Sequence, residues 1–184
     1  MFKKFTRDDL GMRTQIKKKQ IKELRTFLLD KYPKIEEHLD EVVPLKKGSI
    51  ICTVKCSNRV GLLTVNDSIL FFSLMGSEKK AYWYPTLRLI HKYPDILPKV
   101  YVHEGALKRV LRGSNVFSPG IEHTETLSKI SKGETVAVYG IGKEHAVLMG
   151  VTEKSGKDII KVPEDTGVSS LHHLSDGLWY VPTL

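Results

Sequence analysis

The most strongly punctuated part of this chain is Val102-His-Glu-Gly-Ala-Leu-Lys-Arg-Val-Leu-Arg-Gly-Ser-Asn-Val-Phe-Ser-Pro-Gly120. Successive residues of a helix turn by about 100°, so a helix over residues 105–112 has an apolar side and a cationic side. The apolar side carries Ala106, Leu107, Val110 and Leu111, and the cationic side carries Lys108, Arg109 and Arg112. Gly113 follows, where a helix end favours glycine, and Ser118-Pro119-Gly120 breaks the chain again. We therefore predict a strand, a short helix, a second short strand and a turn.

A motif of small and apolar residues in this stretch resembles the opening of a PUA domain. This domain is a small β-barrel-like RNA-binding module of RNA-modifying enzymes and translation proteins. The matching positions are Gly105, Ala106, Gly113, Val116, Pro119 and Gly120. His103 stands where an Asp is common, and Ser114 stands where an Ala usually follows the second glycine. Neither departure changes the predicted fold, but His103 puts in doubt any contact that depends on that Asp.

Composition favours a globular protein of one large or two small domains. The chain has 184 residues, of which 41% are hydrophobic, enough to fill a core. No apolar run approaches the roughly 18 residues of a membrane span. The start, Met1-Phe-Lys-Lys-Phe-Thr-Arg7, lacks the apolar segment of a signal peptide. We therefore expect a cytoplasmic protein that does not bind membranes.

The net positive charge of the chain comes from its first half. The formal net charge is +8, and residues 1–95 hold 19 Lys and Arg against 11 Asp and Glu, leaving ten of each sign for residues 96–184. A field of this sign attracts polyanions such as RNA. An acidic membrane surface would be attracted equally well, so charge alone does not identify the partner.

The first half of the chain predicts two helices and then an antiparallel meander. Residues 1–10 suggest a strand or extended arm, and an apolar stripe indicates a helix from Thr14 to Tyr32 that Pro33 ends. A shorter helix is expected over Ile35–Val43. From Ser49 the period of the sequence pattern changes, and β-branched and aromatic runs predict the strands Ser49–Cys56, Val60–Val65 and Ile69–Met75. Another short strand is expected over Tyr82–Tyr84. Pro85 then fits the first turn of a helix over Thr86–Tyr93.

Lys18, Lys19 and Lys22 lie on the side of the first helix away from its apolar stripe. They are a second, weaker candidate for contact with RNA. A charged stripe of this kind is also what an ordinary solvated helix face presents, and the sequence leaves both interpretations open.

The second half of the chain predicts a small barrel. Alternating apolar residues predict a hairpin whose two strands are Thr135–Tyr139 and Ala146–Val151. Lys154–Gly167 is polar and is expected to loop out, while Ile159-Ile160 and Ser170–Val181 are expected to supply the closing strands. The predicted fold class is α+β, with an N-terminal helix-plus-antiparallel-meander domain over residues 1–95 and a PUA β-barrel-like domain over residues 96–184.

The segment Tyr84-Pro-Thr-Leu-Arg-Leu-Ile-His-Lys-Tyr-Pro-Asp-Ile-Leu-Pro98 carries a sharper resemblance. With the Met1–Phe5 start and the late stretch Leu171–Trp179, it is similar to the malignant-T-cell-amplified-sequence family, called translation machinery-associated protein in fungi. The resemblance covers the whole chain. It implies an N-terminal α/β domain followed by a PUA domain.

The same resemblance implies a function in translation. Family members act with density-regulated protein on the small ribosomal subunit, in recycling, where deacylated tRNA is released, and in reinitiation. They are similar to the front part of ligatin, which carries further domains in one polypeptide. The resemblance therefore implies that a density-regulated protein homologue supplies such domains in trans. It also implies contact with small-subunit rRNA, with tRNA as a further candidate partner.

No residue pattern indicates an enzyme, a metal site or a cofactor. Cys52 and Cys56 lie four apart in an apparent strand, about 13 Å from each other at roughly 3.3 Å per residue, too far to bridge without bending the chain. The seven histidines include no pair at zinc-protease spacing. PUA domains also occur on pseudouridine synthases, but such an enzyme needs a larger catalytic domain than residues 1–95 provide.

The candidate RNA contacts are Gly105, Ala106, Lys108, Arg109, Arg112 and Gly113. The resemblance implies that RNA lies along the glycine loop and this helix, where bare backbone lets phosphates approach and basic side chains neutralise them. Tyr82, Trp83 and Tyr84 could stack bases, although a core role fits them better. Two alternatives stay open: an adaptor that binds only proteins, and an accessory protein in tRNA or rRNA modification or ribosome biogenesis.

Overall fold

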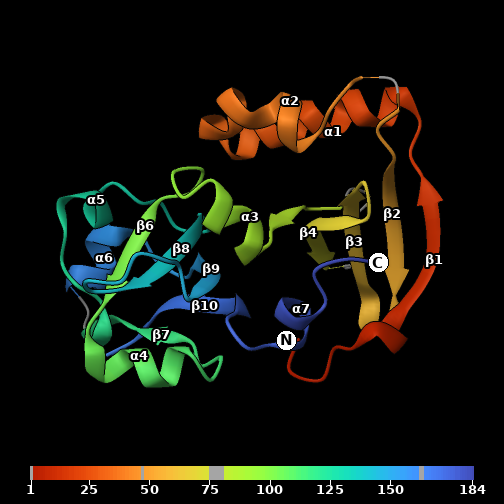
Figure 1. Cartoon of the computed structure of the whole chain (residues 1–184). Coiled ribbons are helices and arrows are strands. Elements are labelled where there is room, and N and C mark those ends of the chain that lie inside the picture. The colour runs from red at the N-terminus through yellow and green to blue at the C-terminus, as the bar shows by residue number, and fades with distance from the viewer. Residues whose placement is uncertain (1, 47, 75–80, 162–163) are drawn as a thin grey trace.

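The computed structural model describes residues 2–46, 48–74, 81–161 and 164–184 and shows two five-stranded sheets side by side (Figure 1). Sheet A is wholly antiparallel and follows chain order: β1 (Leu10–Gln15), β2 (Ile51–Cys56), β3 (Val60–Val65), β4 (Ser68–Leu74) and β5 (Tyr84–Pro85). The predicted meander is therefore present. Met75, the expected end of its third strand, lies outside the described residues.

The tight turn between β3 and β4 shows why this meander forms. Asn66 and Asp67 have φ angles of 47° and 67°, and Val65 pairs with Ser68 across the turn. Two central residues of positive φ match the right-handed twist of a hairpin, and Asn and Asp tolerate that conformation better than most residues. The local sequence thus specifies the β3–β4 register.

The N-terminal helices begin later than the sequence predicts. The first helix, α1, spans Lys18–Lys31, and the helix expected over Ile35–Val43 is a 3-10 turn, η2 (Pro33–His38), followed by α2 (Leu39–Val42). The prediction of a helix from Thr14 is wrong because residues 10–15 are strand β1, which pairs with β2. Before β1, residues 2–9 form the expected arm, with a 3-10 turn at η1 (Arg7–Asp9).

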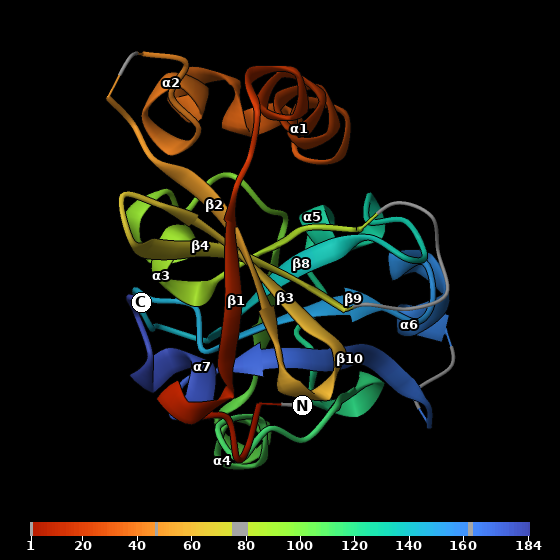
Figure 2. The same cartoon turned by 90° about the vertical axis from the view of Figure 1, so that its right-hand side faces the viewer.

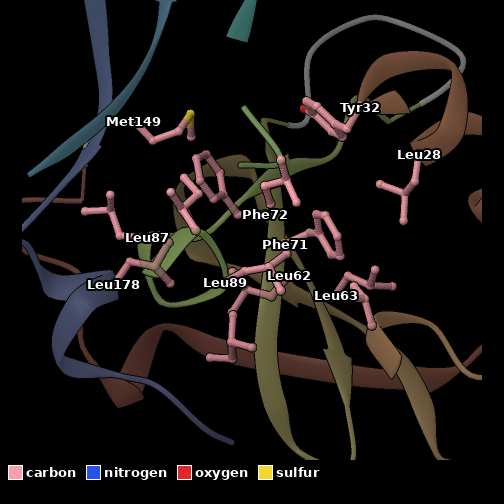
Figure 3. Packing of buried hydrophobic residues seen from close by; sticks show 14 of the residues in the cluster. Leu28, Tyr32, Leu62, Leu63, Phe71, Phe72, Leu87, Leu89, Met149 and Leu178 are labelled. Carbon is pink, nitrogen blue, oxygen red and sulfur yellow. The ribbon is translucent and has the colours of Figure 1, made fainter. Parts of the chain in front are cut away.

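Sheet A is covered on both faces, so β3 is buried at all six positions. Figure 3 shows Leu63 and Phe71 toward α1, where Leu28 lies, and the opposite side of the sheet toward the second half of the chain. The side chains drawn on that opposite side are Leu62, Phe72, Leu87, Leu178 and Met149. Strand β3 therefore reads as a continuous apolar run instead of an alternating one.

Sheet B is curled like part of a barrel, and its strand order is β6 (Lys99–Val102), β8 (Thr135–Gly140), β9 (Leu148–Thr152), β10 (Thr166–His173) and β7 (Val116–Phe117). Strands β6 and β8 are parallel, and the other pairs are antiparallel. The remaining elements are α3 (Leu87–Lys92), α4 (Glu104–Val110), η3 (Ser57–Arg59), η4 (Ser118–Gly120), α5 (Glu125–Ser128), α6 (Gly156–Lys161) and α7 (Gly177–Tyr180). The α+β fold with an N-terminal meander and a PUA-like sheet is confirmed.

Three predictions for the second half are wrong. The polar stretch Lys154–Gly167 is not all loop, since α6 lies within it and its residue Ile159 is fully buried. Ile159-Ile160 is therefore helical and supplies no strand. The last strand also ends earlier than expected, at His173, because Ser175 has a φ of 71° and Asp176 caps α7 by accepting a hydrogen bond from Trp179 N.

One apolar cluster joins the two sheets. It combines residues of sheet A with Ala137, Tyr139 and Met149 of sheet B and with Leu178 next to the N-terminal arm. Figure 1 shows the arm and α7 between the sheets. The division at residues 95 and 96 remains a prediction. None of the described helices is long and apolar enough to cross a membrane.

Candidate nucleic-acid interface

The candidate interface is built around α4, which follows β6 directly. His103 adopts an extended conformation in front of the helix, and Val110 packs into the core of sheet B. Lys108, Arg109 and Arg112 are exposed. The predicted separation of the helix into apolar and cationic sides is therefore present, with Leu111 at the edge and 36% exposed.

Gly113 is required for two physical reasons. Its φ is +83°, a left-handed conformation that favours glycine at the end of a helix. A Cβ there would also lie 2.4 Å from His173 Nε2, closer than any side chain can approach. Gly113 therefore turns the chain sharply from α4 toward β7 and lets the loop pack on β10.

Gly120 permits close packing of η4 on α4, since a Cβ at this position would lie 2.7 Å from Ala106 Cβ. Gly105 is different, because a Cβ there would meet nothing within 4 Å. Packing thus explains Gly120 and Ala106 but gives no reason for Gly105. Bare backbone at Gly105 leaves the surface open to a ligand.

A surface hollow of about 360 Å³ lies between α4 and the segment that contains β7 and η4. Gly105 and Arg109 line it on the helix side, and Phe117, whose side chain is 53% exposed, lines it on the other. The further lining residues are His103, Ala106, Val110, Asn115, Val116, Pro119 and Gly120. The hollow combines an accessible guanidinium, exposed glycine backbone and an aromatic ring, the groups that contact phosphates and unpaired bases.

The structure brings only part of the predicted set together. Gly105, Ala106 and Arg109 line the hollow, whereas Lys108 of α4 and Arg112, in the turn that follows the helix, are exposed outside it. The weaker candidates, Lys18, Lys19 and Lys22, are carried by α1, which both Figure 1 and Figure 2 place at the opposite end of the molecule from α4. The two groups of cations cannot act as one local site.

Comparisons with known proteins agree with this architecture. Residues 5–94 match the Pre-PUA-like domain and residues 98–174 match the PUA domain. The chain is 40% identical to malignant T-cell-amplified sequence 1-B of Xenopus laevis over 185 residues, which cover 100% of this chain and 99% of that protein. This chain belongs to the malignant T-cell-amplified sequence family.

The family relationship extends to fungi and, in fold, to archaea. Translation machinery-associated protein 20 of Eremothecium gossypii is 36% identical over 183 residues and 97% of each chain. A hypothetical protein of Pyrococcus horikoshii superposes with a TM-score of 0.73 at 22% identity, covering 93% of this chain and 99% of that one. A PUA domain protein of Aeropyrum pernix gives 0.68 at 21%, covering 91% and 89%. These structures share the fold of this family member.

Sequence reasoning missed Phe117 and Asn115 as part of the candidate interface. Asn115 Oδ1 accepts a hydrogen bond from Ser170 N at 3.0 Å and so ties the loop to β10. Phe117 follows the buried Val116 in the two-residue strand β7 and is exposed. An aromatic residue directly after an apolar one in a short strand was the signal in the sequence that could have indicated an exposed ring. Tyr82, Trp83 and Tyr84 instead pack against the core cluster, as the core interpretation predicts.

Proposed function

We propose that this protein is a non-enzymatic, RNA-binding translation factor that acts on the small ribosomal subunit through α4. The observation that carries the proposal is the hollow beside α4, where the bare backbone of Gly105 adjoins the exposed guanidinium of Arg109. Lys108 and Arg112 extend the same cationic helix face. Phosphates can approach glycine backbone closely, and basic side chains neutralise them.

The translation role is supported by the relatives. One of them is named translation machinery-associated protein, and the PUA domain matches residues 98–174. We propose that the factor works in the cytoplasm in recycling, where deacylated tRNA leaves the small subunit, and in reinitiation, together with a density-regulated protein homologue. Gly113 and Ala106 shape the RNA-binding surface, and Lys18, Lys19 and Lys22 contribute through long-range charge.

Gradient sedimentation of cell extract tests the proposal directly. The protein should migrate with the small ribosomal subunit at low salt and leave it as salt increases, because RNA contacts release counterions. Migration only in the free fraction would refute a ribosomal role. Cross-linking to free tRNA in place of small-subunit rRNA would instead favour an accessory role in RNA modification.

Replacing Gly105 by alanine should separate stability from binding. A Cβ at this position meets nothing within 4 Å, so the fold accepts it, and the loss of glycine from a helix stabilises by up to about 0.5–1 kcal/mol. The added methyl group, however, projects at the lining of the hollow. We expect an unchanged or higher melting temperature together with weaker binding to the small subunit, measured by thermal unfolding and co-sedimentation. Binding at the wild-type level would show that RNA does not approach this backbone.

A second prediction concerns the partner. The purified protein should co-elute in size-exclusion chromatography as a one-to-one complex with a density-regulated protein homologue at micromolar concentration. Both proteins should first be shown to be folded by circular dichroism. Separate elution would remove the proposed mechanism of recycling and reinitiation without affecting the RNA-binding proposal, which sedimentation tests independently.

A further inference from the structure

Beyond α4, a second group of aromatic and cationic side chains lies where the two halves of the chain meet. We call it the seam surface and define it as Arg88, His91, Lys143, His145, Trp179 and Tyr180. These residues come from α3, from the turn between β8 and β9, and from α7. Three segments that are distant in the sequence thus contribute to one surface.

The planar groups of the seam surface contact one another in series. The Arg88 guanidinium lies 4.2 Å from the centre of the Trp179 ring and donates a hydrogen bond to Trp179 O at 2.8 Å. The rings of Trp179 and His91 are 5.3 Å apart, and His91 stacks on His145 at 5.0 Å and 24°. The His91 ring is fixed by donation from Nε2 to Ala146 O at 2.7 Å. These contacts hold the outermost ring, His145, in a defined orientation.

Groups on this surface are available to a ligand. Arg88, Lys143 and His145 are exposed, and the Tyr180 side chain is 68% exposed. Lys92, at the end of α3, is different because it pairs with Glu41. Within the turn, Glu144 is an exposed acid that offsets part of the positive charge. The charge is therefore modest, and stacking is the larger contribution that this surface can make.

The seam surface is continuous with α4. A Cβ on Gly140, at the base of the β8–β9 turn, would lie 3.0 Å from Leu107 Cδ2 of α4 and 3.0 Å from Lys143 Cγ. The same turn carries His145, which stacks on His91 of α3. The turn thus packs on the apolar flank of α4 at Leu107 and also carries the His145 ring of the seam surface.

We propose that single-stranded RNA bound at α4 continues over the β8–β9 turn onto the seam surface. This inference rests on the proposed RNA-binding function and extends it from one helix to both halves of the chain. Unpaired bases stack on exposed aromatic rings, while cations follow the backbone. Trp, Tyr and Arg are also enriched at protein interfaces, but continuity with α4 favours RNA as the occupant.

The test uses the full chain and labelled oligouridines of about four and about twelve nucleotides, lengths that bracket known single-strand site sizes. The variant Lys143→Gln with His145→Ala alters only exposed side chains of the turn. Its matched control is Lys132→Gln with His123→Ala, which changes one exposed lysine and one exposed histidine elsewhere in the same half; Lys132 precedes β8, at the other end of that strand from the turn.

In fluorescence anisotropy, the turn variant should bind the longer oligouridine at least about fivefold more weakly, about 1 kcal/mol. Its binding of the shorter oligouridine, and both affinities of the control, should stay at the wild-type level. Ultraviolet cross-linking should also place adducts of the longer probe at residues 141–147 or 178–182.

Each of the following results would overturn the inference. Equal losses in the turn variant and its control would reduce the effect to net charge, and adducts confined to residues 103–120 would restrict RNA to α4. If the turn variant binds RNA normally but no longer co-elutes with density-regulated protein, the seam surface binds a protein instead of RNA. Wild-type affinity of the turn variant for the longer probe overturns this inference alone, whereas a wild-type protein that binds neither probe refutes the RNA-binding function as well.

Discussion

Replacing Lys108, Arg109 and Arg112 by alanine is expected to weaken binding to the small ribosomal subunit at least tenfold, about 1.4 kcal/mol. All three side chains are exposed, so the substitutions leave the packing of α4 intact. If each side chain contacts a phosphate, the salt dependence of log K should flatten by roughly two to three units, at about 0.7–0.9 per contact. Co-sedimentation at several salt concentrations measures both quantities.

The control for this prediction lies at the other end of the molecule. Replacing Lys18, Lys19 and Lys22 by alanine removes the same charge from exposed positions of α1. Long-range attraction alone would make both triple variants lose affinity alike. A local contact at α4 makes the first lose at least tenfold more. Equal losses would argue against an RNA-binding surface at α4, and no loss in either variant would favour an adaptor that binds only proteins.

The elements predicted best are those whose causes are local. A left-handed residue must end α4, and Gly113 adopts that conformation where the sequence places it. The β3–β4 hairpin follows from two adjacent residues, Asn66 and Asp67, that accept positive φ. In both cases a few neighbouring residues determine the backbone conformation, so it can be predicted from the local sequence.

The errors have non-local causes. Residues 10–15 carry no strong strand pattern and are exposed or half-buried throughout, yet they form β1 because β2 offers a pairing edge. Ile159 and Ile160 have high strand propensity, but tertiary packing places them in α6. Strand pairing and side-chain burial determine the structure at these positions, since they contribute more to stability than the local secondary-structure propensity.

The candidate site divides in the same way. The cationic side of α4 follows from helical periodicity alone. The hollow does not, because it needs η4 to pack on Ala106, an approach set by the absence of a side chain at Gly120. The stacked rings of the seam surface join α3, α7 and the β8–β9 turn, and no spacing in the sequence indicates that these segments meet.

The last prediction concerns Asp176, a buried carboxylate at the start of α7 that accepts three hydrogen bonds. One of its oxygens accepts hydrogen bonds from His172 Nδ1 at 2.8 Å and His173 N at 3.0 Å, and the other accepts from Trp179 N at 2.9 Å. Asp176 and His172 are 2% and 1% exposed. Burial would raise the pKa of Asp176, but the His172 side chain and the two backbone donors outweigh it and hold this pKa below its ordinary value.

Replacing Asp176 by alanine should lower the free energy of unfolding by about 3–5 kcal/mol, because two buried donors and one part-buried donor lose their acceptor. Denaturant titration followed by tryptophan fluorescence measures this loss, since Trp179 lies on the helix that Asp176 caps. Asp8→Ala, at an exposed aspartate, is the matched control and should change stability by less than about 0.5 kcal/mol.

The pH dependence of stability gives an independent check on Asp176. A carboxyl group whose pKa is depressed by folding stabilises the protein fully above its unfolded pKa, and this contribution disappears as the pH falls through the folded pKa. Wild-type stability should therefore decline on acidification below 3.8, the ordinary value for this group, and the Asp176→Ala variant should lack this part of the decline. If both proteins lose stability in parallel below that pH, Asp176 does not have the lowered pKa that we assign to it.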